Sequence, residues 1–173
     1  MAQLPRVMAD TRQGGALFIV GMHIHDWGKP FDWLPAFLAM PRMIRELEAN
    51  RALGMVSARF CFWGGRTIAV VQYWKSFELL TAYARSDDYE HRPAWLEFYR
   101  SASKSRSTVG LFHETYVVSA GSTESLYFQM PNGFGLTAVT GAVPVTARSA
   151  TAHDRLHASG PGDAGPQPSE ANP

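Results

Sequence analysis

The sequence predicts an α+β fold whose elements follow the order β-α-β-β-α-β of the split βαβ motif. Four segments carry apolar residues that alternate at period two, which is typical of strands. Two other regions carry apolar residues spaced three and four apart, which is typical of amphipathic helices. Gly64 and Gly65 separate the two middle strand-like segments and favour a tight hairpin between them. This order places both helical regions on one face of a four-stranded sheet.

The first predicted strand spans residues 16–25 and is apolar on both faces. One face carries Phe18, Val20, Met22 and Ile24, and the other carries Leu17, Ile19 and Gly21. Such a pattern is typical of a strand that is buried on both sides.

The first predicted helix spans residues 33–50. Its apolar residues recur at helical spacing, and most of its charged residues lie on the opposite side. The apolar positions are Trp33, Phe37, Met40, Ile44 and Leu47. Pro41 lacks an intrahelical hydrogen-bond donor, so we expect a bend there.

Residues 56–63 and 66–74 form the predicted hairpin. Ser76 is a typical N-cap residue, and a helix is expected to follow it. A second helical piece is expected to begin near Pro93, because proline suits the first turn of a helix. Residues 109–118 return to the strand pattern and complete the ferredoxin-like order.

Apolar residues on both faces of the strands predict a homodimer. The helices cover one face only, and monomers rarely expose an apolar patch larger than roughly a few hundred Å². A second copy of the chain is the simplest cover for the other face. Two sheets that face each other enclose an apolar interior, and we expect a small apolar ligand to bind there.

Composition divides the chain into three parts. Residues 14–145 carry the predicted domain, and residues 1–13 form an N-terminal extension. Residues 146–173 contain no aromatic residue and are rich in Ala, Ser, Gly and Pro. Such a segment buries too little apolar surface to offset its ordering entropy, so it is predicted to be a disordered tail.

Charge and cysteine content narrow the function classes. The chain has 16 Lys+Arg against 15 Asp+Glu and no long run of like charge, so nucleic acid is not an expected partner. Cys61 is the single cysteine, which excludes an intramolecular disulfide. No export signal and no apolar stretch of about 18 residues is present, so a cytoplasmic protein without membrane association is expected.

Several blocks of the sequence resemble monooxygenase-like proteins. Residues 72–90, QYWKSFELLTAYARSDDYE, are similar to the signature of antibiotic-biosynthesis-monooxygenase-type dimeric α+β barrels. A closer resemblance, over residues 14–145, is to the monooxygenase-like family represented in fungal fumagillin biosynthesis. It rests on blocks in the same order: AMPRMIREL (39–47), GG (64–65), VQYW (71–74), AR (84–85), EHRPAW (90–95), HETY (113–116) and MPNGFGL (130–136). The resemblance implies a dimeric barrel that oxidises a small metabolite.

A fainter similarity is to the haem-containing aldoxime dehydratases. By this similarity, His113 corresponds to the iron ligand of those enzymes, and Met130 corresponds to their catalytic distal histidine. Haem held by His113 is the cofactor that this similarity implies. A thioether at Met130 cannot move protons on an oxime, which argues against nitrile-forming dehydration.

Three residues are candidates for cofactor binding. His113 alternates with Leu111 and Val117 on an apolar strand face, where it is either an iron ligand or a core histidine bonded to a carbonyl. His91 is the alternate axial ligand, because haem-degrading relatives ligate haem from this helix; otherwise it is a surface histidine. Arg59 either snorkels at a sheet edge or binds a carboxylate such as a propionate.

The predicted substrate pocket contains His23, Trp63, Tyr73 and Met130. His23 shares a strand face with His25, and with His113 the pair would form a three-nitrogen metal site; otherwise they are polar residues at a strand end. The leading hypothesis is a monooxygenase-like oxidoreductase that acts on a small apolar or conjugated metabolite, with His113 as the catalytic residue. The alternatives are a haem-dependent lyase and a non-catalytic protein that binds haem or a hydrophobic ligand.

Overall fold

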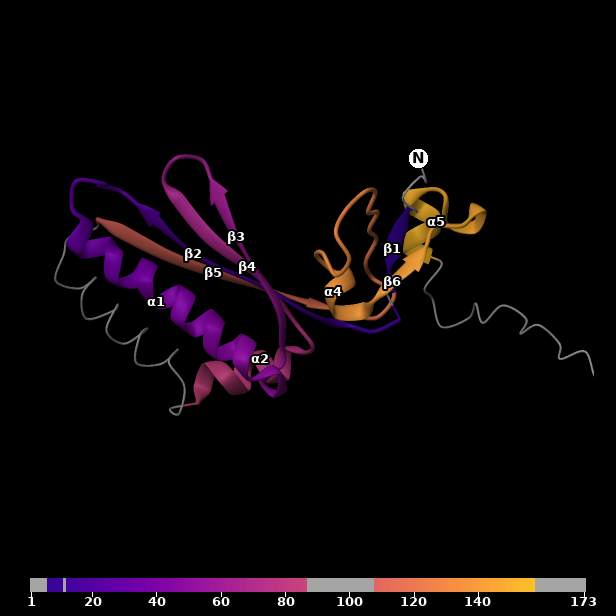
Figure 1. Cartoon of the computed structure of the whole chain (residues 1–173), viewed down its shortest axis with the longest axis horizontal. Coiled ribbons are helices and arrows are strands. Elements are labelled where there is room, and N and C mark those ends of the chain that lie inside the picture. The colour runs from indigo at the N-terminus through magenta and orange to yellow at the C-terminus, as the bar shows by residue number, and fades with distance from the viewer. Residues whose placement is uncertain (1–5, 11, 87–107, 158–173) are drawn as a thin grey trace, which may run out of the picture. The chain divides into compact units, whose positions relative to one another are not determined.

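The computed structural model describes residues 6–10, 12–86 and 108–157 (Figure 1). The chain divides into two compact units, one of residues 15–117 and one that joins residues 1–14 to residues 118–173. None of the helices in the three described ranges is long and apolar enough to span a membrane.

The larger unit contains a four-stranded sheet with the order β3-β4-β2-β5. Its strands are β2 (Gly15–Ile24), β3 (Met55–Trp63), β4 (Thr67–Trp74) and β5 (Val109–Val118). β4 pairs antiparallel with both β2 and β3, and β5 is hydrogen-bonded to β2. The first and last strands of the predicted β-α-β-β-α-β order are therefore neighbours, as the split βαβ motif requires, and the predicted ferredoxin-like α+β fold is confirmed.

The helices of this unit are α1 (Pro30–Ala49), the 3₁₀ turn η1 (Arg51–Leu53) and α2 (Phe77–Arg85). α1 begins three residues before the predicted start, because Pro30 suits a first helical turn and Asp32 offsets the positive end of the helix dipole. Ser76 caps α2 as predicted: its Oγ accepts a hydrogen bond from the Leu79 amide at 3.3 Å. The helical piece predicted from Pro93 lies outside the described residues.

α1 and α2 pack on one face of the sheet, and Figure 1 shows α1 running along the strands. The strand register brings Val20 of β2 opposite Val70 of β4, and both contribute to this face. The main cluster here consists of Ala16, Ile44, Leu47, Met55, Val70, Trp74, Leu80 and Tyr83. A second cluster consists of Met22, Ile24, Ile68 and Val109. The apolar residues that recur at period two in the strands and at period 3.6 in the helices thus pack together in one core.

The opposite face of the sheet, here called the open face, also carries large side chains. Trp63 of β3 pairs with Thr67 of β4. Thr67 is next to the core residue Ile68, and neighbouring residues of a strand point to opposite faces, so Thr67 and Trp63 lie on the open face. Phe112 of β5 stacks on Trp63, with ring centroids 5.6 Å apart. Gly21 leaves room for this aromatic, because a Cβ on Gly21 would lie 2.7 Å from the Phe112 ring. The prediction of a sheet with apolar residues on both faces is correct.

The smaller unit contains a two-stranded sheet and short helices. β1 (Val7–Ala9) pairs antiparallel with β6 (Ala142–Pro144), and α4 (Thr137–Thr140) precedes β6. The 3₁₀ turn η2 (Ala147–Ser149) and α5 (Ala152–His157) follow it.

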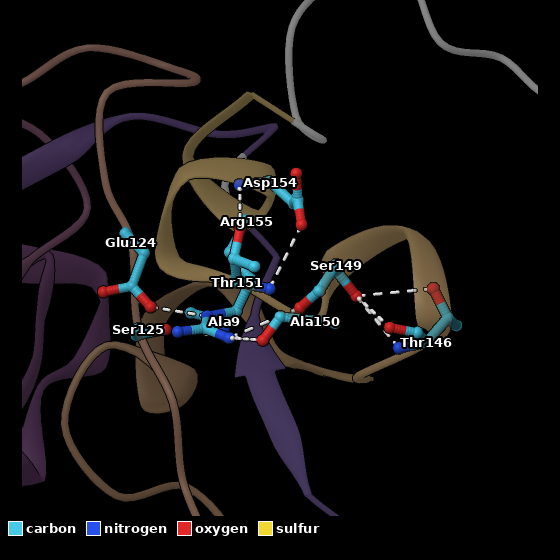
Figure 2. Close-up of polar contacts among 9 residues, drawn as sticks. All are labelled: Ala9, Glu124, Ser125, Thr146, Ser149, Ala150, Thr151, Asp154 and Arg155. Atoms are coloured by element: carbon cyan, nitrogen blue, oxygen red, sulfur yellow. Dashed lines mark hydrogen bonds and ion pairs between the residues drawn. The ribbon is translucent and has the colours of Figure 1, made fainter.

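Residues 147–149 and 152–157 are thus helical, although the sequence predicted disorder from residue 146 onward. The buried Arg155 anchors this segment (Figure 2). Its guanidinium donates to the Glu124 carboxylate and to the carbonyls of Ser149 and Ala150. A count of aromatic and apolar residues misses an anchor of this kind, because the packing depends on one cation and the carbonyls it binds.

Replacing Arg155 with methionine is expected to destabilise the smaller unit. The variant leaves the Glu124 carboxylate and two carbonyls without their donor, which costs about 1–3 kcal/mol. Hydrogen exchange at the β1 and β6 amides measures the effect, and we expect exchange to quicken by about tenfold or more. Arg12→Ala, which removes the exposed Arg12–Asp10 pair of the same unit, is the control and should leave exchange unchanged. Equal exchange in the Arg155 variant would contradict the anchoring role.

Candidate functional site

A cavity of about 960 Å³ lies between the sheet and the helices α1 and α2, within the larger unit. This volume falls within the roughly 300–1,000 Å³ of small-molecule sites. Most of its lining is apolar and includes several aromatic and methionine side chains. Among these are Phe18, Met22, Phe37, Met40, Met43, Phe60, Trp74 and Phe77, and Leu111 adds an aliphatic side chain. We call this space the helix–sheet cavity.

His113 lines the helix–sheet cavity from β5, two positions along the strand from Leu111. Its ring centroid lies 5.9 Å from that of Phe18, which also lines the cavity. The prediction that His113 shares a strand face with Leu111 and Val117 agrees with this placement.

The cavity lies on the helix-covered face, whereas the sequence placed the ligand between two sheets. The prediction assumed that the helices pack fully onto their own face. In the structure, α1 and α2 meet the sheet through their buried residues, such as Ile44 and Leu80, and leave room beside β5. The ligand interior expected between the open faces of two copies stays a prediction, and the helix–sheet cavity is a second candidate site.

Three described residues of the cavity lining can titrate: Tyr83, Arg85 and His113. The Tyr83 hydroxyl donates to Glu46 Oε2 at 2.9 Å. Arg85 ends α2 and supplies a permanent positive charge. Of the three, His113 carries an imidazole, the side chain that most often acts as a general acid or base.

Gln72 is the cavity residue that sequence reasoning missed. It is buried on β4, and its Oε1 accepts a hydrogen bond from Trp74 Nε1 at 3.0 Å. Its signal in the sequence is a polar side chain in phase with Ile68, Val70 and Trp74, on the core face of a predicted strand. A polar residue at such a position needs a partner.

Four predicted site residues occupy the open face: His23, Arg59, Trp63 and Tyr73. His23 Nδ1 lies 2.8 Å from Thr67 Oγ1. The sheet therefore separates these residues from the cavity that His113 lines.

The expected three-histidine site is not formed. The His23 and His25 rings lie 4.7 Å apart, but His113 lines the opposite side of the sheet. Within residues 6–10, 12–86 and 108–157, no group of three or more His, Cys, Asp or Glu side chains is placed to hold a metal ion. Alternation along β2 and β5 decides this, because it fixes which ring shares a face with which.

Two further candidates remain. Met130 belongs to the smaller unit, where its side chain is exposed. His91 lies outside the described residues.

Solved structures similar to the chain share its fold. An aldoxime dehydratase, OxdRE, determined in complex with butyraldoxime, matches 79% of this chain with a TM-score of 0.64 and 21% sequence identity. The chain spans 40% of the length of that enzyme.

Two smaller proteins match less of the chain. SnoaB, a cofactor-independent oxygenase from Streptomyces nogalater, has a TM-score of 0.37 and 11% identity over 60% of this chain and 91% of its own. A dimeric ferredoxin-like protein from an uncultured marine organism has a TM-score of 0.40 and 13% identity over 67% of this chain and 97% of its own. No match was found among curated proteins.

A protein-family model, monooxygenase af470-like, matches residues 16–136. The matched range begins within β2 and includes all of β3, β4 and β5. It therefore contains every described residue that lines the helix–sheet cavity, including Gln72 and His113. The chain belongs to the monooxygenase af470-like family.

Proposed function

We propose that the protein is a monooxygenase-like oxidoreductase that binds a small apolar metabolite in the helix–sheet cavity and oxidises it beside His113. One observation carries this proposal: an apolar cavity of about 960 Å³ is lined by a single imidazole among its described residues. Apolar walls supply binding energy, and a lone imidazole supplies a proton acceptor at a defined place.

The walls favour a flat, conjugated molecule. Phe18, Phe37, Phe60 and Phe77 present aromatic surface from the sheet and both helices. Aromatic rings stack on such molecules in offset or edge-to-face arrangements. Methionines at positions 22, 40 and 43 adapt to irregular ligand shapes, because their side chains are unbranched.

His113 is proposed as the catalytic residue. Its imidazole would remove a proton from an activated C–H bond of the substrate, and the resulting carbanion would react with O₂. Oxidation of a CH₂ group to a carbonyl consumes one O₂, keeps one oxygen atom on carbon and releases the other with the two hydrogens as water. The substrate supplies all the electrons, so this reaction needs no external reductant.

The cavity residues also fit a haem. His113 offers a neutral nitrogen ligand for iron, the aromatic walls suit a porphyrin face, and Arg85 offers a cation for a propionate. When bound, haem would supply oxygen activation at iron. Arg59, the cation that the sequence suggested, lies on the open face and would not reach a porphyrin in this cavity.

Oxygen uptake with 2-tetralone tests the proposal. This apolar bicyclic ketone carries a CH₂ between an aromatic ring and a carbonyl, where proton removal is easiest. We expect protein-dependent oxygen consumption and the corresponding 1,2-dione as product. Binding of fluorene, measured by equilibrium dialysis, reports separately on the apolar cavity. Absence of both binding and oxygen uptake would overturn the proposal.

We further propose that the protein is a homodimer joined through the open face. Val71, Tyr73 and the stacked Trp63–Phe112 pair make this face largely apolar. Sedimentation equilibrium is expected to give twice the 19.1 kDa chain mass at micromolar concentration. Val71→Lys should shift the mass toward that of the monomer, because a charge in the middle of an apolar interface is costly. A monomeric wild type, or a lysine variant that still dimerises, would contradict this interface.

A further inference from the structure

The Gln72 carboxamide has a fixed orientation. An indole nitrogen can only donate, so the group that faces Trp74 Nε1 at 3.0 Å must be the amide oxygen of Gln72. The two N–H donors on Nε2 therefore point away from the indole. Trp74 is itself almost fully buried and packs against Tyr83 in a tilted arrangement, with ring centroids 5.9 Å apart, so the orienting group is held in place.

These amide donors are unused by the described part of the chain. The bond from Trp74 is the one hydrogen bond of the Gln72 side chain among the described residues. Among the described residues, two completely buried polar side-chain atoms have no hydrogen-bond partner, Trp33 Nε1 and Ser57 Oγ. Gln72 Nε2 is not one of them, so this atom keeps some accessible surface. Gln72 is 5% exposed and lines the helix–sheet cavity, so that surface faces the cavity. A buried amide whose unpaired N–H donors face a cavity is suited to bind a ligand that carries a hydrogen-bond acceptor.

Gln72 and His113 lie on the same cavity wall, on either side of Phe18. The register places Phe18 of β2 opposite Gln72 of β4, and the His113 ring on β5 lies 5.9 Å from the Phe18 ring. Two strand spacings separate β4 from β5, which is about 10 Å between backbones. Side chains from strands this far apart can contact a carbonyl oxygen and the carbon next to it in one molecule, with the flat face of that molecule on Phe18.

We propose that Gln72 Nε2 donates a hydrogen bond to a carbonyl oxygen of the substrate, so that the cavity selects apolar molecules that carry a carbonyl. This inference rests on the proposed function, because it names the substrate class of the same cavity. The same bond would strengthen as His113 removes a proton next to the carbonyl, since the charge then moves onto that oxygen. Gln72 thus defines one end of the substrate and His113 defines the reacting carbon.

The test compares two ligands that share one tricyclic frame, fluorene and 9-fluorenone, under anaerobic conditions. The two differ by the carbonyl alone, and the ratio of their dissociation constants, compared between variants, cancels their difference in hydration. We expect Gln72→Met to reduce the preference for 9-fluorenone by about tenfold while fluorene binding stays within twofold. In isotope-edited infrared spectra, the carbonyl stretch of bound 9-fluorenone should lie at lower frequency in the wild type than in Gln72→Met.

Two further variants separate the role of Gln72 from side effects. Gln72→Met leaves the Trp74 indole without its acceptor, so the double variant Gln72→Met/Trp74→Phe removes both partners and should show the same loss of preference. Thr115→Val removes a different hydrogen-bond donor, a hydroxyl, from the cavity wall. This variant should keep the wild-type preference for 9-fluorenone. Circular dichroism melting of each variant checks that the fold is retained.

Three outcomes would overturn the inference. If both ligands bind and their ratio is the same in the wild type and in both Gln72 variants, the cavity proposal stands and the role of Gln72 falls. If Thr115→Val loses the preference and the Gln72 variants keep it, the donor is Thr115. If neither ligand binds the wild type, the proposed function fails and the inference falls with it.

Discussion

Replacing His113 with alanine is expected to abolish oxidation of 2-tetralone and any uptake of haem. The imidazole lines the helix–sheet cavity, and among the described lining residues the other titratable groups are a tyrosine already bonded to Glu46 and an arginine. The Tyr83 hydroxyl is engaged with Glu46, and the arginine side chain has no free electron pair to offer, so neither is expected to replace the imidazole as base or as iron ligand. A positioned general base contributes about 10²–10⁴-fold, so oxygen uptake should fall by at least about 100-fold. The second readout is the Soret band of protein produced with iron and a haem precursor.

Two other histidines serve as controls. His25→Ala alters the open face and should keep both oxygen uptake and any Soret band, because the sheet separates it from the cavity. His91→Ala tests the alternate axial ligand from the sequence and is expected to behave like the wild type. If the Soret band survives in His113→Ala and disappears in His91→Ala, the ligand role passes to His91. If neither haem uptake nor oxygen consumption depends on His113, its proposed roles are wrong.

Replacing Leu47 with alanine is expected to lower the free energy of unfolding by about 2–5 kcal/mol. Leu47 is 1% exposed on α1 and packs with Ile44, Met55 and Trp74 in the main cluster between helix and sheet. Removing three side-chain carbons there leaves a void that the surrounding strands cannot close completely. Urea unfolding followed by circular dichroism measures the loss, with an unchanged dependence on denaturant concentration.

Leu38→Ala is the matched control for this substitution. Leu38 lies on the same helix but is 52% exposed, so the same change of side chain should alter the free energy of unfolding by less than about 0.5 kcal/mol. Equal losses for the two leucines would show that α1 does not pack on the sheet through the face that carries Leu47.

The strands of the larger unit could be predicted from the sequence almost to the residue, whereas β1 and β6 of the smaller unit were not predicted. The final strand was expected at 109–118 and is found there, and the first was expected at 16–25 and spans Gly15–Ile24. Alternation at period two is a local property that the chain carries in its own order of residues. The start of α1 was less accurate, because Pro30 and Asp32 act through helix-end geometry rather than through apolar spacing.

The candidate site could be predicted only in part. Alternation identified His113 as the neighbour of Leu111 and Val117 on one strand face, but it could not tell which face the cavity occupies. That depends on how far α1 and α2 cover the sheet, which is a property of tertiary packing. His23, Trp63 and Tyr73 were therefore grouped with His113 although the sheet lies between them.

Polar anchors were the least predictable feature. Gln72 and Arg155 are both buried; Gln72 accepts one hydrogen bond from Trp74 on the same strand, and Arg155 donates three, one of them to Glu124, which is 31 residues away in the sequence. A composition argument counts such residues as surface. In the sequence, these residues stand out only as a polar residue in an apolar strand and a charged residue in a low-complexity segment. Neither feature shows that the residue is buried unless its hydrogen-bond partner is known.

Nuclear magnetic resonance of the ¹⁵N-histidine-labelled protein tests most directly whether the ligand binds in the helix–sheet cavity. The ring nitrogens would be assigned with one variant per histidine and followed during titration with fluorene. We expect the His113 signals to shift on binding while those of His23 and His25, on the open face, stay in place. Shifts of His23 and His25 without a change at His113 would place the ligand on the open face and contradict the proposed site.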